Sequence, residues 1–420
     1  MKKTLLLIFV AFVANHSFSQ KELAKELIDT LASDEFYGRG YVNEGDKIAA
    51  NFIVKKFKEY GALPGNGDSY VQQYSFPVNT FPGKVKIVIE GKTLKTGQDF
   101  IVAPNSGSAN GKFKLKRITT DNYMNEVGIE QLQNDNSQIA YVIDLPKSKG
   151  REEYISQLKL KNSIAQVAPL FLLNDGKFTW SVAQEALPFP IIEINSSLLE
   201  NKDEVLLSIE NSFIESYQTQ NVLGYIPAKR KCKRNNYFVF TAHYDHLGMM
   251  GETATFNGAN DNASGVAMML SLMKYFSENP PKYSVLFIGF GGEEAGLIGS
   301  KYYVENPLVP LNKMKFLFNV DLMGTGSEGI QVVNSTEHPK EFDRLKKINE
   351  KENLLSAIKP RGKAANSDHY WFEEAGVPSF FVYTLGGVTH YHDILDRAET
   401  LPLTEFDDLH RLIVEFANSF

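Results

Sequence analysis

Apolar residues recur at helical spacing in two stretches near the start of the chain, residues 21–33 and 46–60. In the second stretch the apolar side chains share one face of a helix, at Ile48, Phe52, Ile53, Phe57 and Tyr60. The segment GALPGNGDS, residues 61–69, ends this pattern because glycine and proline interrupt helices. We therefore predict two amphipathic helices followed by a loop.

The middle of the chain has a different pattern, with short apolar runs separated by polar stretches. KVKIVIEGKTL (84–94) is typical of a strand hairpin with a charged outer face. Further short apolar runs are QIAYVIDLP (138–146), APLFLLND (168–175) and FPIIEIN (189–195), and a helical stretch covers residues 151–165. No histidine occurs between residues 79 and 218. We predict that this region is a separate α/β module without catalytic residues.

Beyond residue 221, near-continuous apolar runs alternate with helical patterns. The runs are YFVFTAH (237–243), YSVLFIGF (283–290), KFLFNVD (315–321) and SFFVYTL (379–385). Strands that are buried on both faces have this composition. The stretch 266–276 between the first two runs has helical periodicity. The pattern predicts an α/β fold with a mixed, mostly parallel sheet flanked by helices.

These patterns divide the chain into four parts. Residues 1–19 form a leader, residues 20–78 the helical start of the main domain, residues 79–218 an inserted smaller α/β domain, and residues 219–420 the rest of the main domain.

The leader has the features of a secretory signal. It begins with two lysines, continues with an apolar run from Leu5 to Ala14, and ends with small residues before Gln20. The rival interpretation is a membrane anchor, but the apolar run is shorter than the ~20 residues that a membrane span requires. We expect cleavage near Ser19, export to the periplasm or the exterior, and no integral membrane span.

Charge and cysteine content narrow the partners and the chemistry. Cleavage would remove Lys2 and Lys3 but no acidic residue, so the formal net charge would fall from −6 to −8. A negative chain is a poor partner for nucleic acid or anionic membranes. Cys232 is the single cysteine, which excludes an intrachain disulfide. Any metal site must therefore use histidine and carboxylate ligands.

Polar side chains collect directly after the predicted buried strands. His243 and Asp245 follow the first strand, Glu293 and Glu294 the second, and Asp321 the third. In open α/β sheets, ligands bind beyond the carboxyl ends of the strands. We therefore expect these side chains to meet at one edge of the sheet.

Two further segments contribute to the same set. Asp261 lies in GANDNASG, before the helical stretch, and His390 and His392 lie beyond the last strand. Five of the seven histidines in residues 20–420 fall within 243–246 and 369–392. Such clustering is unlike scattered surface histidines. Each residue alone also has an ordinary structural interpretation, as a helix cap, a turn former or a solvated side chain.

Histidine and carboxylate together suit zinc, and catalytic zinc sites keep a position for water. Two Zn²⁺ ions would be neutralised by the carboxylates of Asp261, Glu294 and Asp321 with one bridging hydroxide, which leaves Glu293 as an uncoordinated base. Asp245 could hold the ring of His243 in its metal-binding tautomer. We expect His246, the residue after Asp245, to face the other way and not to bind metal.

The order of motifs AHYDHLG, NGANDNASGVA, FIGFGGEEAGLIGSKYYV, NVDLMG, SDHYWF and YHDILDRAETL resembles the M28 family of zinc metallopeptidases. The N-terminal LASDEFYGRG is similar to the helical opening of such enzymes. The middle region is similar to the protease-associated insert of some members. The resemblance covers the C-terminal part of the chain most specifically.

The resemblance implies a role for each ligand position. His243 and Asp321 would bind one zinc ion. Glu294 and His392 would bind the other, and His392 is preferred over His390 because the family has a Tyr-His pair followed four residues on by an aspartate, here Asp396. Asp261 would bridge the two ions.

The resemblance also implies that Glu293 is the general base and that Tyr391 helps to stabilise the oxyanion. Asn260 stands where many members have a second aspartate, a departure that leaves the bridging position intact. Ser367, Asp368 and His369 match a family segment near the site, and we assign them no role.

The function expected from these residues is a two-zinc exopeptidase that removes N-terminal residues from peptides. Three alternatives remain open. They are a glutaminyl cyclase with one zinc ion, a carboxypeptidase, and a binding protein on an inactive peptidase scaffold. A cyclase would not need His243 as a ligand, and an inactive relative would lack ligands that are present here.

Overall fold

The computed structural model describes residues 20–119, 132 and 138–420. The leader predicted over residues 1–19 lies outside the described residues. A helix covers residues 20–31, and α2 covers Gly45–Glu59, so both predicted N-terminal helices are confirmed. Two short turns, η1 (Asp34–Arg39) and η2 (Val42–Glu44), connect them.

The four runs predicted as buried strands form the centre of the main sheet. They are β12 (Tyr237–His243), β15 (Ser284–Phe290), β16 (Met314–Val320) and β19 (Ser379–Thr384). These strands pair in parallel, in the order β15-β12-β16-β19. The flanking pairs are antiparallel, with β11 (Ser212–Ile226) beside β15 and β17 (Ile330–Val333) beside β19. The mixed, mostly parallel α/β class is thus confirmed.

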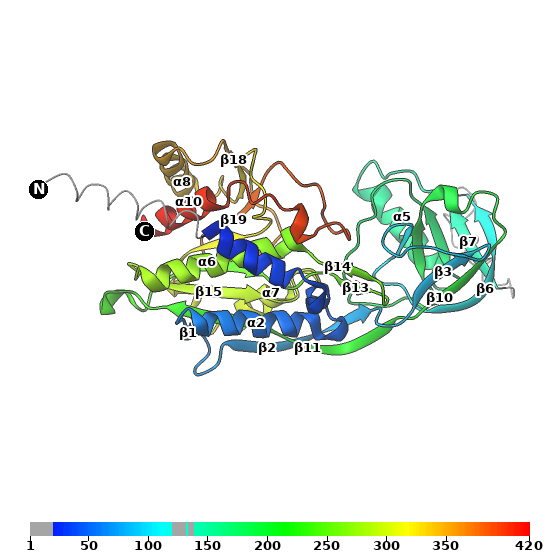
Figure 1. Cartoon of the computed structure of the whole chain (residues 1–420), viewed down its shortest axis with the longest axis horizontal. Coiled ribbons are helices and arrows are strands. Elements are labelled where there is room, and N and C mark those ends of the chain that lie inside the picture. The colour runs from blue at the N-terminus through cyan, green and yellow to red at the C-terminus, as the bar shows by residue number, and fades with distance from the viewer. Residues whose placement is uncertain (1–19, 120–131, 133–137) are drawn as a thin grey trace, which may run out of the picture.

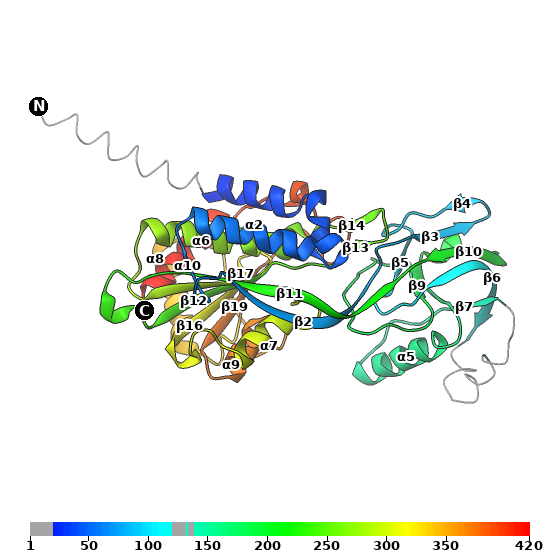
Figure 2. The ribbon, with the colours of Figure 1, turned by 90° about the horizontal axis from the view of Figure 1, so that it is seen from below.

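Helices cover both faces of this sheet (Figure 2). The helix over residues 20–31, α2, α6 (Gly265–Glu278), α8 (Pro339–Glu352) and α10 (Phe406–Asn418) share one apolar core with one face. The shorter helices α7 (Ile298–Glu305) and α9 (His369–Glu374) pack on the opposite face, where Tyr303 and Phe372 stack with their ring centroids 5.6 Å apart. The strands are therefore buried on both sides, which explains their continuous apolar composition.

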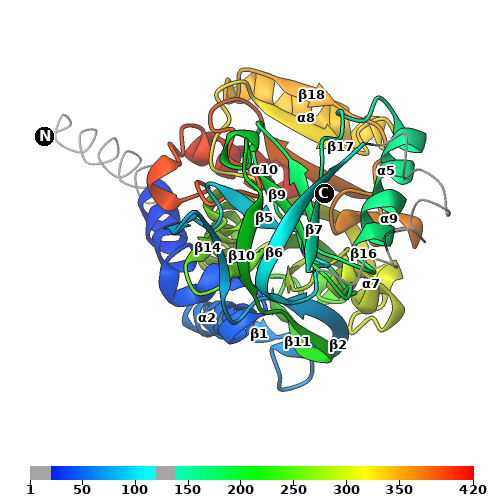
Figure 3. The same cartoon turned by 90° about the vertical axis from the view of Figure 1, so that its right-hand side faces the viewer.

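A second sheet lies beyond one end of the main sheet (Figures 1 and 3). Its strand order is β4-β3-β10-β6-β7-β8-β9-β5. The strands are β3 (Val85–Ile89), β4 (Lys92–Thr93), β5 (Phe100–Val102), β6 (Ala109–Ile118), β7 (Ile139–Ile143), β8 (Leu170–Leu173), β9 (Ile191–Ile194) and β10 (Glu204–Ile209), and α5 covers Arg151–Ile164. This second unit has apolar cores of its own.

Two long strands connect the units. β2 (Val71–Thr80) pairs with β11 in antiparallel fashion, from Val71 opposite Val222 to Thr80 opposite Ser212. The ends of the region 79–218 therefore lie within strands of the main sheet. The hairpin of β13 (Gly248–Met250) and β14 (Ala254–Phe256) also joins the units, because Met250 and Phe256 pack into the core of the second sheet.

The remaining strands, β1 (Leu63–Pro64) and β18 (Ile358–Pro360), are short and lie at the edges of the main sheet. In the described part of the chain, every helix is too short or too polar to cross a membrane.

Asp46, in the first turn of α2, ties that helix to β11. Its buried carboxylate accepts hydrogen bonds from the hydroxyls of Tyr217 (2.5 Å) and Thr219 (2.7 Å). Burial raises the pKa of Asp46 from 3.8 to about 6, even though both hydrogen bonds act in the opposite direction. The folded state therefore binds the Asp46 proton more tightly than the unfolded chain does.

This raised pKa predicts a pH-dependent contribution to stability. The contribution of Asp46 is fully present below pH 3.8 and is lost as the pH rises through about 6. Relative to Asp46→Asn, the free energy of unfolding of the wild type should fall by about 2 kcal/mol between pH 4 and pH 7. Denaturant titrations of both proteins across this range measure the difference. A difference that is constant with pH would contradict the prediction.

Candidate metal centre

The predicted site residues meet at the carboxyl ends of the parallel strands. His243 is the last residue of β12, Asp321 directly follows β16, and Glu293 and Glu294 lie in the turn after β15. Asp261 comes from the turn that precedes α6. Parallel pairing of β12 with β15 and β16 places all these strand ends at one edge. The sheet therefore brings together residues that are far apart in sequence.

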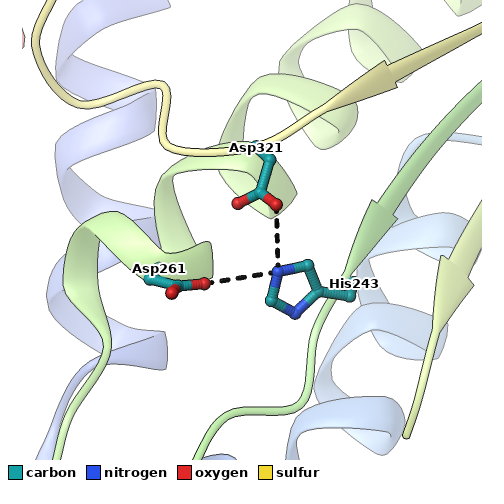
Figure 4. A group of neighbouring side chains, drawn as sticks. All are labelled: His243, Asp261 and Asp321. Carbon is teal, nitrogen blue, oxygen red and sulfur yellow. Dashed lines mark ion pairs between the residues drawn. The ribbon is translucent and has the colours of Figure 1, made fainter. Parts of the chain in front are cut away.

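His243 lies between two carboxylates (Figure 4). Its Nε2 atom is 3.3 Å from Oδ1 of Asp261 and 3.4 Å from Oδ2 of Asp321. All three residues are buried, and their ligand atoms are close enough to share one metal ion.

His392 forms a matching arrangement on the other side of Asp261. Its Nε2 atom is 3.1 Å from Oδ2 of Asp261 and 3.2 Å from Oε2 of Glu294. The two oxygens of Asp261 thus face two different histidines, Oδ1 toward His243 and Oδ2 toward His392. This is the arrangement that a carboxylate bridging two ions requires.

A pocket of about 190 Å³ opens onto these groups. Its lining is His243, Asp261, Glu293, Asp321, Leu322, Asn366, Phe381, Tyr383, Tyr391 and His392. The ring of Tyr391 stacks on that of His392, with centroids 3.9 Å apart, and the residue is 49% exposed. Tyr391 therefore stands at the rim of the pocket, and its role at an oxyanion stays a prediction.

The adjacent glutamates have opposite acid–base properties. Burial by itself raises the pKa of Glu294, but the charge of His392 and hydrogen bonds to His246 and His392 outweigh burial and hold it at about 2. Burial raises the pKa of Glu293 well above its usual range, against the attraction of His243. Glu294 is therefore ionised, as a ligand must be, while Glu293 can hold a proton.

Asp261 is also ionised despite its burial. Burial raises its pKa, but hydrogen bonds to His243 and His392 overcome this effect and hold the pKa well below the usual range. The same contacts act on the histidine, because burial lowers the pKa of His392 while Glu294 and Asp261 raise it to about 11. The centre thus pairs anionic carboxylates with groups that carry positive charge.

The carboxylate of Asp245 supports the glutamate turn. It accepts hydrogen bonds from the backbone N–H groups of Glu293 (3.1 Å) and Glu294 (3.3 Å) and from the hydroxyl of Tyr41 (2.8 Å). The Nδ1 atom of His243 is 3.1 Å from the backbone oxygen of Asp245 and 3.9 Å from its carboxylate. We expected the side chain of Asp245 to hold the ring of His243 with its Nε2 atom toward the site. The backbone oxygen of Asp245 makes this contact instead.

Two neighbours of the site make contacts that were not predicted from the sequence. His246 does not face away, because its Nδ1 atom is 2.7 Å from Oε1 of Glu294. Alternation along an extended chain had suggested otherwise, but β12 ends at His243 and the chain turns there. Asp396 accepts hydrogen bonds from the backbone N–H groups of Asn260 (2.8 Å) and Asp261 (3.0 Å). Its conspicuous position after the YH pair was the available signal.

The segment 367–369 is buried beside the pocket. The hydroxyl of Ser367 accepts a hydrogen bond from Asn319 (2.8 Å), and the ring of His369 lies 5.2 Å from that of Phe381, a lining residue. Burial raises the pKa of Asp368 to about 7. His390 is directed elsewhere, with its Nδ1 atom 3.5 Å from Asp393.

A buried arginine from the N-terminal segment ties the site loops together. The guanidinium of Arg39 donates to the backbone oxygens of Tyr244 (2.9 Å), Asn257 (2.6 Å) and Gly258 (2.6 Å). It also donates to the backbone oxygen of Asp261 (3.3 Å). Burial lowers the pKa of Arg39 to about 10, so the group remains charged at neutral pH.

Fold and site together define an α/β protein with a buried histidine–carboxylate centre at the edge of its sheet. The model of Peptidase family M28 matches residues 221–417, the part of the chain that contains every residue of this centre. This part of the chain is thus similar to Peptidase family M28.

Two aminopeptidases are similar in sequence to this chain. The chain is 26% identical over 306 residues to aminopeptidase YwaD of Bacillus subtilis, covering 69% of this chain and 63% of that protein. An aminopeptidase of Pseudomonas aeruginosa is 35% identical over 114 residues, 27% of this chain and 19% of that protein.

The fold is similar to that of BSAP, a zinc aminopeptidase from Bacillus subtilis, with a TM-score of 0.68, 19% identity and 94% of each chain covered. It is also similar to a Peptidase M28 precursor from Shewanella amazonensis, with a TM-score of 0.66, 16% identity and 96% of each chain covered.

The contacts of Arg39 predict that Arg39→Lys is strongly destabilising. A lysine has one ammonium group and cannot reach acceptors on separate loops, so buried carbonyls lose their partner. We expect the free energy of unfolding to fall by about 3 kcal/mol or more.

Denaturant unfolding measures this loss. The matched control is Arg411→Lys, at a side chain that is 57% exposed, which should change stability by about 0.5 kcal/mol at most. Equal effects of the two substitutions would contradict the role of Arg39.

Proposed function

We propose that this protein is a zinc-dependent aminopeptidase that hydrolyses the N-terminal peptide bond of peptides. The observation that carries the proposal is the position of Asp261, whose two oxygens face His243 and His392. Each histidine has a further carboxylate beside it, Asp321 or Glu294. The names of the relatives, which include aminopeptidases, support the same class.

The residues fit two zinc ions. Imidazole nitrogens and carboxylate oxygens are the ligands that zinc accepts in the absence of thiolates. The Oδ1 atom of Asp321 is buried and has no hydrogen-bond partner within the described part of the chain, which suits an atom that faces an ion. His243 and Asp321 would hold one ion, Glu294 and His392 the other, and Asp261 both.

Bound zinc would supply a water molecule of lowered pKa and a Lewis acid for the scissile carbonyl. Glu293 lies at the pocket and, in the proposed mechanism, does not bind metal. Its carboxylate would take a proton from the attacking water and deliver it to the departing amine. The high pKa of Glu293 suits the second step, in which the residue must first retain the proton. Tyr391 would donate a hydrogen bond to the oxyanion from the rim.

The pocket suits the end of a peptide. Its volume of about 190 Å³ is below the roughly 300 Å³ at which sites for larger ligands begin. Leu322, Phe381 and Tyr383 supply apolar surface beside the polar centre. A small pocket favours a ligand such as a single terminal residue, and therefore an exopeptidase.

Substitution of the proposed base tests the mechanism. Glu293→Gln keeps the shape and every metal ligand but cannot accept the proton. We expect unchanged zinc content and a kcat that is lower by about 100- to 10,000-fold. The control is Glu305→Gln at an exposed position on α7, which should retain wild-type kcat. Full activity of Glu293→Gln would refute the role of this residue.

Two measurements test the reaction class: the effect of metal removal, and the end from which a peptide is shortened. A chelator should abolish hydrolysis of aminoacyl-arylamides, and added zinc should restore it, with two zinc ions bound per chain. A defined peptide should be shortened from its N-terminus, and its N-acetylated form should resist. Shortening from the C-terminus would instead indicate a carboxypeptidase. One zinc ion per chain with cyclisation of N-terminal glutamine would indicate a glutaminyl cyclase.

A further inference from the structure

A segment of the second unit reaches the metal centre. Residues 177–184, here called the bridging segment, follow β8 of the second sheet and contact two loops of the main domain. One loop, residues 389–393, carries His392, and the other is the turn that carries Glu293 and Glu294. The family assignment does not account for these contacts, because the matched region begins at residue 221.

Trp180 and His392 make two reciprocal hydrogen bonds. The backbone N–H of Trp180 donates to the backbone oxygen of His392 (2.9 Å), and Nδ1 of His392 is 2.9 Å from the backbone oxygen of Trp180. A carbonyl oxygen can only accept, so Nδ1 of His392 carries the proton. When the ring is neutral, as a metal ligand must be, Nε2 is the unprotonated nitrogen, and it is the atom that faces Asp261 and Glu294.

Lys177 holds the same loop from the outer side. Its ammonium group donates to the backbone oxygens of Thr389 (3.0 Å) and Tyr391 (2.8 Å) and pairs with the carboxylate of Asp393 (2.8 Å). The side chain of Lys177 is 42% exposed. These three contacts are with residues that precede or follow His392 in the sequence, and none of them is with His392 itself.

The loop needs such support because His392 has a φ of +56°, a conformation that residues with a side chain rarely adopt. Trp180 is itself well anchored. Its indole N–H donates to the backbone oxygen of Val102 (2.8 Å), and its ring lies 4.7 Å from that of Phe256. The bridging segment is therefore a firm support for a strained loop.

The other end of the bridging segment contacts the glutamate turn. The side-chain N–H of Gln184 donates to the backbone oxygen of Ala295 (2.7 Å), the residue after Glu294. The backbone oxygen of Ala183 accepts from the N–H of Asn79 in β2 (2.9 Å). One short segment thus supports both loops that supply Glu294 and His392.

We propose that the bridging segment of the second unit positions the Glu294–His392 half of the metal centre, with Lys177 and Trp180 as positioning residues for His392. The second unit is then part of the machinery that determines zinc affinity. This inference rests on the proposed function, because it assumes the two-zinc centre. It adds that residues outside the matched family region control one of the two ions.

The test measures binding of Zn²⁺ alone to the full chain by competition with a chelator. Lys177→Met removes the three contacts to the loop, and Trp180→Phe removes the indole hydrogen bond while keeping an aromatic ring. Each variant should weaken one of the two zinc ions by about 10- to 100-fold, the usual effect of removing support for a ligand. The affinity for the other ion should stay as in the wild type.

His392→Ala, which removes the ligand, shows how loss of this zinc ion appears in the same assay. The matched control is Lys202→Met, a lysine of the second unit that pairs with Glu90 (2.7 Å) away from the centre, and it should bind both ions normally. Circular dichroism and thermal unfolding check that every variant is folded.

Equal zinc affinities in wild type, Lys177→Met and Trp180→Phe would overturn the inference, as would equal weakening of both ions in folded variants. A wild-type chain that binds two zinc ions without hydrolysing peptides would refute the proposed function. The zinc affinities of the variants would still test this inference. A wild-type chain that binds fewer than two would overturn both.

Discussion

The structure depends on the crowding of buried carboxylates at the edge of the main sheet. The acidic side chains there come from Asp245, Asp261, Glu294, Asp321 and Asp396, with Glu293 at the adjoining pocket. Like charges this close destabilise the folded chain unless positive charge or hydrogen-bond donors compensate. Asp245, Asp261, Glu294, Asp321 and Asp396 have such compensation, from the histidines, from backbone N–H groups, or from the hydroxyl of Tyr41. Cations bound at the centre would remove the rest of the repulsion, and their binding would then stabilise the folded chain.

Support for this acidic cluster comes from all parts of the chain. The parallel strands bring His243, Glu294 and Asp321 together, because the carboxyl ends of these strands coincide. The N-terminal segment provides Arg39, whose charge and donors hold the loops around Asp261. The second unit provides Trp180 and Lys177 for the loop of His392. A site assembled from loops would be mobile by itself, and these buried or multiply bonded contacts give it the fixed geometry that metal binding and proton transfer require.

Prediction from the sequence succeeded where periodicity or position after a strand carried the information. The two N-terminal helices, the four central strands and the convergence of His243, Asp261, Glu294, Asp321 and His392 all follow from such local signals. Prediction was less successful where the relevant contact is made by the backbone or by a distant side chain. The backbone oxygen of Asp245, rather than its carboxylate, contacts His243, and the expected direction of His246 was wrong because the strand ends before it. Arg39 gave no local signal, since its acceptors lie in other parts of the chain.

The sequence by itself determined the fold class and the grouping of polar residues after the strands, because hydrophobic periodicity and the order of polar residues are local properties of the chain. Only the tertiary structure decided which oxygen of Asp261 faces which histidine, how Glu293 and Glu294 differ in pKa, and that Trp180 and Lys177 reach the loop of His392. These properties depend on distances and burial between residues that are remote in sequence. Periodicity carries no record of such distances, since they arise only when the sheets and loops pack.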